Sequence, residues 1–167
     1  YPLDTSISNI WRSWYSFRRG KRKTSEMEEF SYYLENNLSR LHEDIINRQY
    51  KHGLYRKFLV CDSKKREISV APVRDRVVHR LLYDYLVKIY DKTFIYDSCA
   101  NRKGKGTLFA LKRFEKFRRK VTNNFTSEAF CFKADIKHYF EEVDHGILIK
   151  LLERKVADEK VIWWIKQ

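Results

Sequence analysis

The chain has 167 residues, of which 35 are Lys or Arg and 22 are Asp or Glu, so its formal net charge is +13. This length suits one domain of roughly 100–200 residues, and 43% hydrophobic residues are enough for a core, which excludes a disordered chain. The charge favours a polyanionic partner, with a membrane surface as the weaker alternative.

Cysteine usage and hydropathy predict a cytoplasmic protein with no membrane partner. Cys61, Cys99 and Cys131 are far apart and odd in number, which fits neither a disulfide framework nor a zinc site. No apolar run approaches the ~20 residues that span a bilayer. The first residues also lack a basic-then-apolar signal pattern.

The first third of the chain predicts helices. A short amphipathic helix is expected over residues 8–18, followed by a basic cluster over residues 18–23. Ser25 and Glu28 have the spacing of a capping box for a second, longer helix. Its apolar stripe has spacings of three and four and consists of Met27, Phe30, Leu34, Leu38, Leu41 and Ile45.

The next segment predicts a β-hairpin and a helix. Runs 55–61 and 66–70 flank the polar tetrad 62–65, and Pro72 ends the second strand. Apolar residues with a period of 3.6 then predict a helix over 74–90. Lys64, Lys65 and Arg66 at the hairpin tip suit a triphosphate, because Arg offers a bidentate fork, but a solvated turn is the alternative.

Residues 97–107 place Gly104 and Gly106 around Lys105, before a helix that should begin at Thr107. Backbone amides in such a segment can face a phosphate, although the spacing is not that of a Walker loop. The helix that follows has cations around an apolar side, which suits either solvated surface or nucleic-acid contact.

Residues 129–134 form an apolar run that predicts a buried strand, with Asp135 emerging at its end. Phe140 follows five residues later, and a helix should start near Asp144. Glu141, Glu142 and Asp144 are interpreted as solvated or capping groups. The dispersed histidines and the apolar setting of Cys131 argue against a zinc enzyme or a thiol hydrolase.

These segments, in this order, resemble bacterial reverse transcriptases over about residues 10–165. Within that family they are most similar to the enzymes of diversity-generating retroelements, with group II intron maturases as the alternative. The resemblance implies an α+β fold, the fingers of a right-hand polymerase with a partial palm. Residues 1–124 would be the helix-rich fingers, with the hairpin at 55–70, and residues 125–167 the start of the palm.

The resemblance also assigns roles near the reaction. Asp135 would be the catalytic ligand of Mg²⁺ (or Mn²⁺), with the Ile136 backbone carbonyl as a second ligand. Phe140 would exclude the 2′-hydroxyl of ribonucleotides. Arg66, with Lys65, would contact the triphosphate.

Further positions would contact the nucleic acid or the nucleotide. Arg76 is expected near the template or the incoming nucleotide. The remaining cations expected at the nucleic acid are Arg19, Lys21, Arg22, Arg102, Lys103 and Lys105. The implied partners are an RNA template, a DNA primer and dNTP, and an accessory protein of the element is a candidate partner.

The chain departs from the family in one respect that bears on catalysis. The family's second metal-binding segment contains an Asp-Asp pair, and none occurs in these 167 residues. Two metal ions need several carboxylates, so we expect this chain alone to bind nucleic acid without polymerising. The alternative is a non-catalytic RNA-binding module derived from polymerase fingers.

Overall fold

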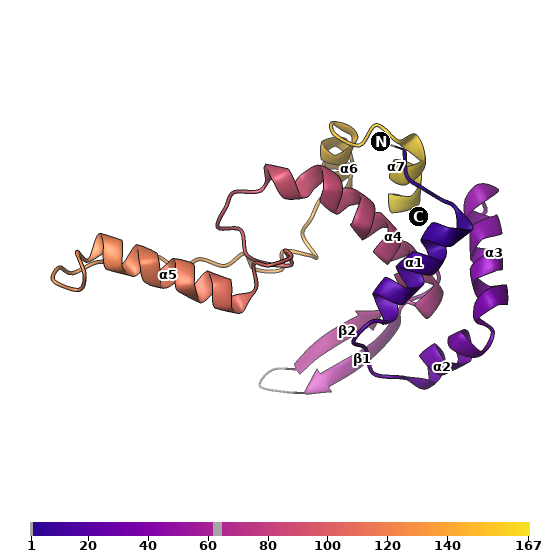
Figure 1. Ribbon diagram of the computed structural model, residues 1–167, viewed down its shortest axis with the longest axis horizontal. Helices are drawn as coiled ribbons and strands as arrows, with labels where there is room; N and C mark the ends of the chain where they lie inside the picture. The colour runs from indigo at the N-terminus through magenta and orange to yellow at the C-terminus, as the bar shows by residue number, and fades with distance from the viewer. Residues whose placement is uncertain (1, 62–64) are drawn as a thin grey trace. The chain divides into compact units, whose positions relative to one another are not determined.

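The computed structural model describes residues 2–61 and 65–167. Helix α1 (Ile7–Arg18) confirms the first predicted helix (Figure 1). The Ser6 hydroxyl caps it by accepting a hydrogen bond from the Asn9 amide at 3.3 Å. Ile10, Trp14 and Phe17 recur at spacings of four and three and bury one face of this helix.

The predicted long helix is two helices, α2 (Ser25–Tyr32) and α3 (Leu34–Ile46). Thr24, not Ser25, is the N-cap of α2, because its hydroxyl accepts from the Met27 amide. The chain turns at Tyr33, and the Asn37 side chain donates to the Phe30 carbonyl at 3.0 Å across the break. The apolar stripe continues through both helices, which explains why the sequence pattern did not show the break.

The hairpin prediction is confirmed by strands β1 (Arg56–Cys61) and β2 (Lys65–Val70), which pair antiparallel with Phe58 opposite Ile68. Helix α4 (Val73–Tyr90) follows at once. Its first amide, that of Val73, donates to the Glu26 carboxylate at 2.7 Å, so a side chain from α2 satisfies the N-terminus of α4.

The chain divides into two compact units, one made of Tyr1–Val87 and Ile149–Gln167, the other of Lys88–Leu148. The core of the first unit joins α1, α3 and α4, with Trp14, Leu38 and Val77 buried among their neighbours. Helix α7 (Glu159–Ile165) adds Trp164 to this core. The Leu3 amide also donates to Asp158, the N-cap of α7, at 2.8 Å.

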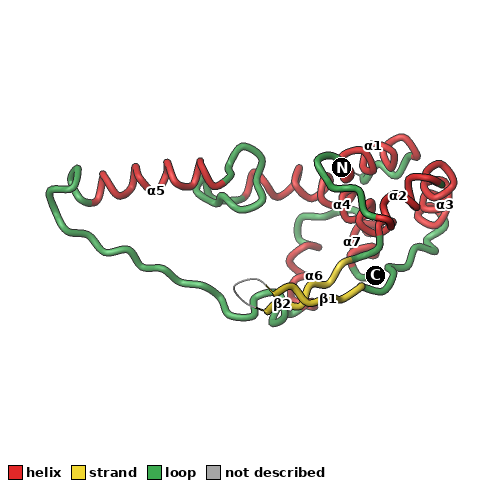
Figure 2. The backbone as a smooth tube through the Cα atoms, turned by 90° about the horizontal axis from the view of Figure 1, so that it is seen from below, coloured by secondary structure: helices red, strands yellow, loops and turns green. Residues whose placement is uncertain are grey.

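The second unit contains the 3₁₀ turn η1 (Asp91–Thr93), helix α5 (Thr107–Val121) and an extended segment that leads to α6 (His145–Glu153). The start of α5 at Thr107 confirms the prediction. The strand predicted over residues 129–134 is wrong: these residues form an exposed loop, visible in Figure 2 between α5 and α6. A strand needs a neighbouring strand, and in the described part of the chain β1 and β2 pair only with each other.

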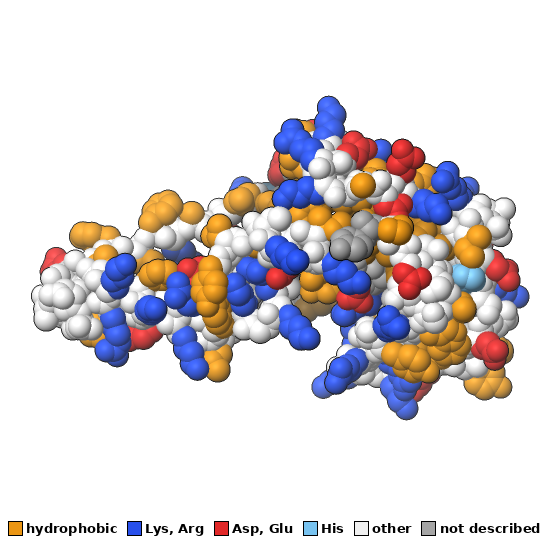
Figure 3. Space-filling view, turned by 45° about the horizontal axis from the view of Figure 1, so that its top comes forward, with side chains coloured by type: hydrophobic (Ala, Val, Ile, Leu, Met, Phe, Trp, Pro, Cys, Tyr) orange, Lys and Arg blue, Asp and Glu red, His pale blue; other side chains and the backbone are white. Residues whose placement is uncertain are grey.

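The coarse fold class is therefore confirmed as α+β, rich in helix and with an antiparallel hairpin. Lysine and arginine side chains are spread over the face drawn in Figure 3, with hydrophobic side chains between them. Within residues 2–61 and 65–167, no helix is both long and apolar enough to cross a bilayer. The division at residues 124 and 125 concerns function and stays a prediction.

Candidate nucleic-acid interface

Three of the predicted basic residues, Arg19, Lys21 and Arg76, line one hollow in the first unit. Arg80, which the sequence did not single out, lines it too, and the hollow has a volume of about 380 Å³. We call this hollow the basic pocket. It combines the end of α1 and the turn that follows it with the first half of α4.

An aromatic ring holds two of these cations in place. The Lys21 ammonium lies 3.8 Å from the centre of the Phe17 ring, and the Arg76 guanidinium lies 5.3 Å from it. Such contacts orient a cation without neutralising it. Partial burial, followed by the charges of Arg76 and Arg80, lowers the pKa of Lys21. The four cations that line the pocket concentrate positive charge here.

The hairpin carries the predicted triphosphate contacts on exposed strand positions. Arg66 pairs with Val60 and Lys65 with Cys61, next to the tip. The side chains of Arg66 and Lys65 point to opposite faces, because successive strand residues alternate. Lys64 lies outside the described residues. Farther from the tip, Lys57 forms an exposed ion pair with Glu67 at 2.6 Å.

The base of the hairpin is fixed by a buried carboxylate, Asp75, in the first turn of α4. Asp75 is 1% exposed and accepts hydrogen bonds from the Tyr50 hydroxyl and the Gly53 amide, both at 2.9 Å. A Cβ on residue 53 would lie 2.9 Å from Pro72 Cγ and 3.0 Å from Asp75 Oδ2, so only glycine permits this approach. The sequence held a signal, because Asp75 lies on the apolar stripe of its helix, where a charge needs partners.

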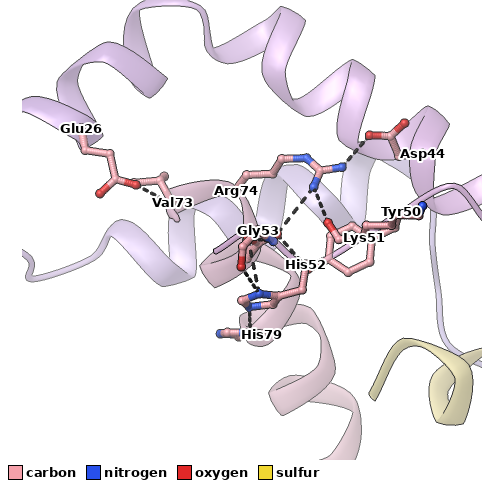
Figure 4. Close-up of polar contacts among 10 residues, drawn as sticks. Glu26, Asp44, Tyr50, Lys51, His52, Gly53, Val73, Arg74 and His79 are labelled. Carbon is pink, nitrogen blue, oxygen red and sulfur yellow. Dashed lines mark hydrogen bonds and ion pairs between the residues drawn. The ribbon is translucent and has the colours of Figure 1, made fainter. Parts of the chain in front are cut away.

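Arg74 and two histidines complete this network (Figure 4). Arg74 binds Asp44 of α3 at 2.5 Å and the Lys51 carbonyl at 3.2 Å. The rings of His52 and His79 stack, with their Nε2 atoms 3.1 Å apart. The contact of His52 Nδ1 with the Gly53 carbonyl at 2.6 Å fits His52 as the donor there and His79 as the donor to His52 Nε2. Hydrogen bonds to α3 and α4 therefore hold the segment that leads into β1, and we call this network the anchor.

In the second unit, Arg102 is used to fold its own loop. It forms a two-pronged ion pair with Asp91, at 2.8 and 3.2 Å, and donates to the Ile95 and Ser98 carbonyls. Lys105 donates to the Tyr96 carbonyl and lies 4.1 Å from the centre of that ring. Lys103 is exposed, as is Arg22 in the first unit. The nucleic-acid contacts of Arg22, Lys103 and Lys105 stay predictions. The hydrogen bonds of Arg102 give that residue a structural role in its loop.

The predicted catalytic segment lies in the second unit and is exposed throughout. Asp135 follows the loop, the Ile136 side chain is 68% exposed and Phe140 is 89% exposed. Asp144 caps α6, since its side chain accepts from the Ile147 amide at 2.9 Å, which confirms the capping interpretation. Glu141 is bound to His138.

The described residues do not form a complete metal site. Among residues 2–61 and 65–167, no three His, Cys, Asp or Glu side chains lie together in a way that could hold an ion. Mg²⁺ needs near-octahedral oxygen ligation, and a single exposed carboxylate such as Asp135 does not supply it.

Comparison with known proteins gives one partial similarity. No family model matches the chain. It is 30% identical, over 103 residues or 62% of its length, to an uncharacterized 91 kDa protein in a cob intron of Schizosaccharomyces pombe. The chain spans about 12% of the length of that relative.

Proposed function

We propose that the chain forms the fingers and the start of the palm of an RNA-directed DNA polymerase, and that it binds the backbone of template and primer. Two observations support the polymerase: the ordered segments that resemble reverse transcriptases, and the similarity to a protein in an intron. Such a protein would belong to a retroelement and would work in the cytoplasm.

The observation that carries nucleic-acid binding is the basic pocket. Arg19 and Lys21 come from the end of α1, and Arg76 and Arg80 come from α4, yet all four line one hollow. Like charges brought together cost free energy unless an anion offsets the repulsion. A net charge of +13 extends the same preference for anions over the whole chain.

The roles near the reaction follow from the resemblance. Arg66, with Lys65, would bind the dNTP triphosphate, and the exposed strand positions of both leave their side chains accessible. Phe140 would close the space for a 2′-hydroxyl. Asp135, with the Ile136 carbonyl, would hold Mg²⁺ (or Mn²⁺) only together with further carboxylates of a longer protein. The bound metal would neutralise charge that develops at the transferred phosphoryl group.

The alternative is a non-catalytic RNA-binding module. The two functions differ at Asp135. A carboxylate beside a polyanion weakens binding, so a pure binding module gains affinity when Asp135 is neutralised and loses nothing. A polymerase in which Asp135 is neutralised loses DNA synthesis.

A salt titration tests the binding itself. Each phosphate that the protein neutralises on single-stranded RNA contributes about 0.7 to the slope of log affinity against log salt concentration. A chain that neutralises about three phosphates should therefore lose affinity roughly 20-fold between about 50 and 200 mM salt. Fluorescence anisotropy with a labelled RNA of mixed sequence measures this, and an affinity that does not change with salt would contradict the proposal.

A further inference from the structure

We propose that the basic pocket is a binding site for one phosphate of a nucleic-acid backbone, held by Arg19, Lys21, Arg76 and Arg80. The inference rests on the proposed function and deepens it, because it names where a strand is held. It also assigns a role to Arg80, which no sequence pattern indicated.

Two segments nearly sixty residues apart deliver two cations each to a hollow of about 380 Å³. Phe17, the last buried residue of α1, contacts both Lys21 and Arg76 through its ring. The pocket is therefore preorganised by the core of the first unit, which lowers the cost of ordering flexible cations around an anion.

Within the described ranges of the chain, only two of the four cations in the pocket are paired with carboxylates. Arg76 has an ion pair with Glu26 at 3.1 Å, and Arg80 has one with Asp84 at 2.8 Å. In the part of the chain that the structure describes, Arg19 and Lys21 have no carboxylate within ion-pair distance. The pocket thus has more cations than anions. His79 also lines it, and burial followed by the charge of His52 lowers the pKa of His79, so this ring is neutral at pH 7.

Arg76 has one buried hydrogen-bond donor that the described residues leave unused. The Nε atom of Arg76 is buried and has no hydrogen-bond partner among the described residues. A buried N–H without a partner is unfavourable in general, and an ion or a water molecule is one explanation for such a donor. The Nη2 atom of Arg76 already donates to Glu26 at 3.1 Å, so Nε is a donor of this guanidinium that is left for an oxygen of the phosphate.

The size of the charge excess points to a backbone phosphate. Two cations beyond those paired with Glu26 and Asp84 suit a phosphodiester, which carries one negative charge. A nucleoside triphosphate carries several and would remain undercompensated here. We therefore assign the pocket to a strand and the hairpin, with Arg66, to the triphosphate.

The test compares two double variants of the whole chain that remove the same positive charge. Arg19→Gln with Lys21→Gln removes the unpaired cations of the pocket. Arg12→Gln with Arg40→Gln removes two exposed cations of α1 and α3 that do not line it. A third variant, Arg19→Lys with Lys21→Arg, keeps the charge. Circular dichroism and thermal melting verify that each variant is folded.

The readout is anisotropy with a single-stranded RNA oligonucleotide over a range of salt concentrations. Loss of one phosphate contact should lower the salt slope by about 0.7 and weaken binding about 5-fold near 0.1 M salt for the pocket variant. The charge-keeping variant should bind like the wild type, and the surface variant should keep the wild-type slope. Equal losses in the pocket and surface variants would overturn the inference while the proposed function stands.

Two further outcomes are informative. If the wild-type chain does not bind RNA at all, the proposed nucleic-acid binding is wrong, and so is the assignment of the basic pocket to a backbone phosphate. A second arm titrates dATP and inorganic phosphate into the wild type and the pocket variant by calorimetry. If the pocket variant loses dATP binding and keeps its RNA affinity, the site belongs to a nucleotide and the backbone assignment is wrong.

Discussion

The Tyr50 hydroxyl donates a hydrogen bond of 2.9 Å to the Asp75 carboxylate, and the two residues are 2% and 1% exposed. Burial, followed by this hydrogen bond, raises the pKa of Tyr50, so the hydroxyl remains protonated and can only serve Asp75 as a donor. The pair connects the loop before β1 to the first turn of α4. The same helix supplies Arg76 and Arg80 to the basic pocket.

Tyr50→Phe should therefore destabilise the chain. The change deletes one of the two short hydrogen bonds to a buried carboxylate, and a charged acceptor left short of a partner costs about 1–3 kcal/mol. Urea unfolding monitored by circular dichroism measures the free energy of unfolding.

The matched control is Tyr15→Phe, because Tyr15 is 57% exposed on α1. It should change the free energy of unfolding by less than about 0.5 kcal/mol. Asp75→Ala leaves both the Tyr50 hydroxyl and the Gly53 amide without their acceptor and should cost more than Tyr50→Phe. Equal stability of Tyr50→Phe and the wild type would show that this bond does not hold the anchor.

The stacked histidines predict a loss of stability in acid. Burial, followed by the charge of His52, lowers the pKa of His79 below its ordinary value near 6.5. A histidine with a lowered folded-state pKa stabilises the fold fully above about pH 6.5, and this contribution is lost as the pH falls through the lowered value. Unfolding experiments at about pH 7.5 and 5 should show the decrease.

His79→Gln should make that decrease smaller, because glutamine can still donate to His52 and does not titrate. The control His42→Gln alters a histidine on α3 that lies outside this stack and should keep the wild-type decrease. If His79→Gln and the wild type lose the same stability between the two pH values, the His52–His79 pair is not the cause.

Local features were predictable from the sequence. The apolar periods and turn residues of α1, the hairpin and α4 are set by neighbours within a few positions, and each of these elements was predicted close to its bounds, as was the start of α5. The break at Tyr33 was missed, because no glycine or proline marks it and the stripe from Met27 to Ile45 reads as one face.

Features that depend on distant residues were not predictable in the same way. Residues 129–134 have the composition of a buried strand, but a strand forms only where another strand offers hydrogen bonds, and sequence composition does not report that. Arg19 and Arg76 line the same pocket only because the end of α1 lies next to α4, where the Phe17 ring contacts Arg76. The roles of Asp135 and Phe140 stay predictions from resemblance.

Arg66 should matter for the nucleotide more than for the nucleic acid. In a polymerase that carries this chain, Arg66→Gln removes charge-assisted hydrogen bonds worth about 1.5–3 kcal/mol, so the KM for dNTP should rise roughly 10- to 100-fold. Template affinity should change little. Arg56→Gln, at the other end of the hairpin, is the control and should leave the KM near that of the wild type. A KM that is equally altered in both variants would contradict the assignment.

Phe140 should control sugar selection without stabilising this chain. Since its ring is 89% exposed, Phe140→Ala should leave the melting temperature of the chain unchanged. In the polymerase, steric exclusion of one hydroxyl contributes about 1–3 kcal/mol to discrimination between dNTP and rNTP. The preference for dNTP should therefore fall by tens- to hundreds-fold while synthesis persists.

The control for sugar selection is Phe130→Ala, which truncates a ring that is 99% exposed in the same segment. It should keep the wild-type preference. If single-nucleotide incorporation shows the same ratio of dNTP to rNTP for Phe140→Ala as for the wild type, Phe140 does not face the sugar.

Primer extension on an RNA template, with Mg²⁺ and a protein that carries this chain, tests the polymerase assignment most directly. Asp135→Asn keeps the shape of the side chain and removes its charge, whereas Glu128→Gln removes an exposed charge from the same segment and serves as the control. Asp135→Asn should abolish DNA synthesis while template binding is kept or slightly strengthened. Glu128→Gln should extend the primer like the wild type. Extension by Asp135→Asn at a near wild-type rate would contradict the polymerase assignment.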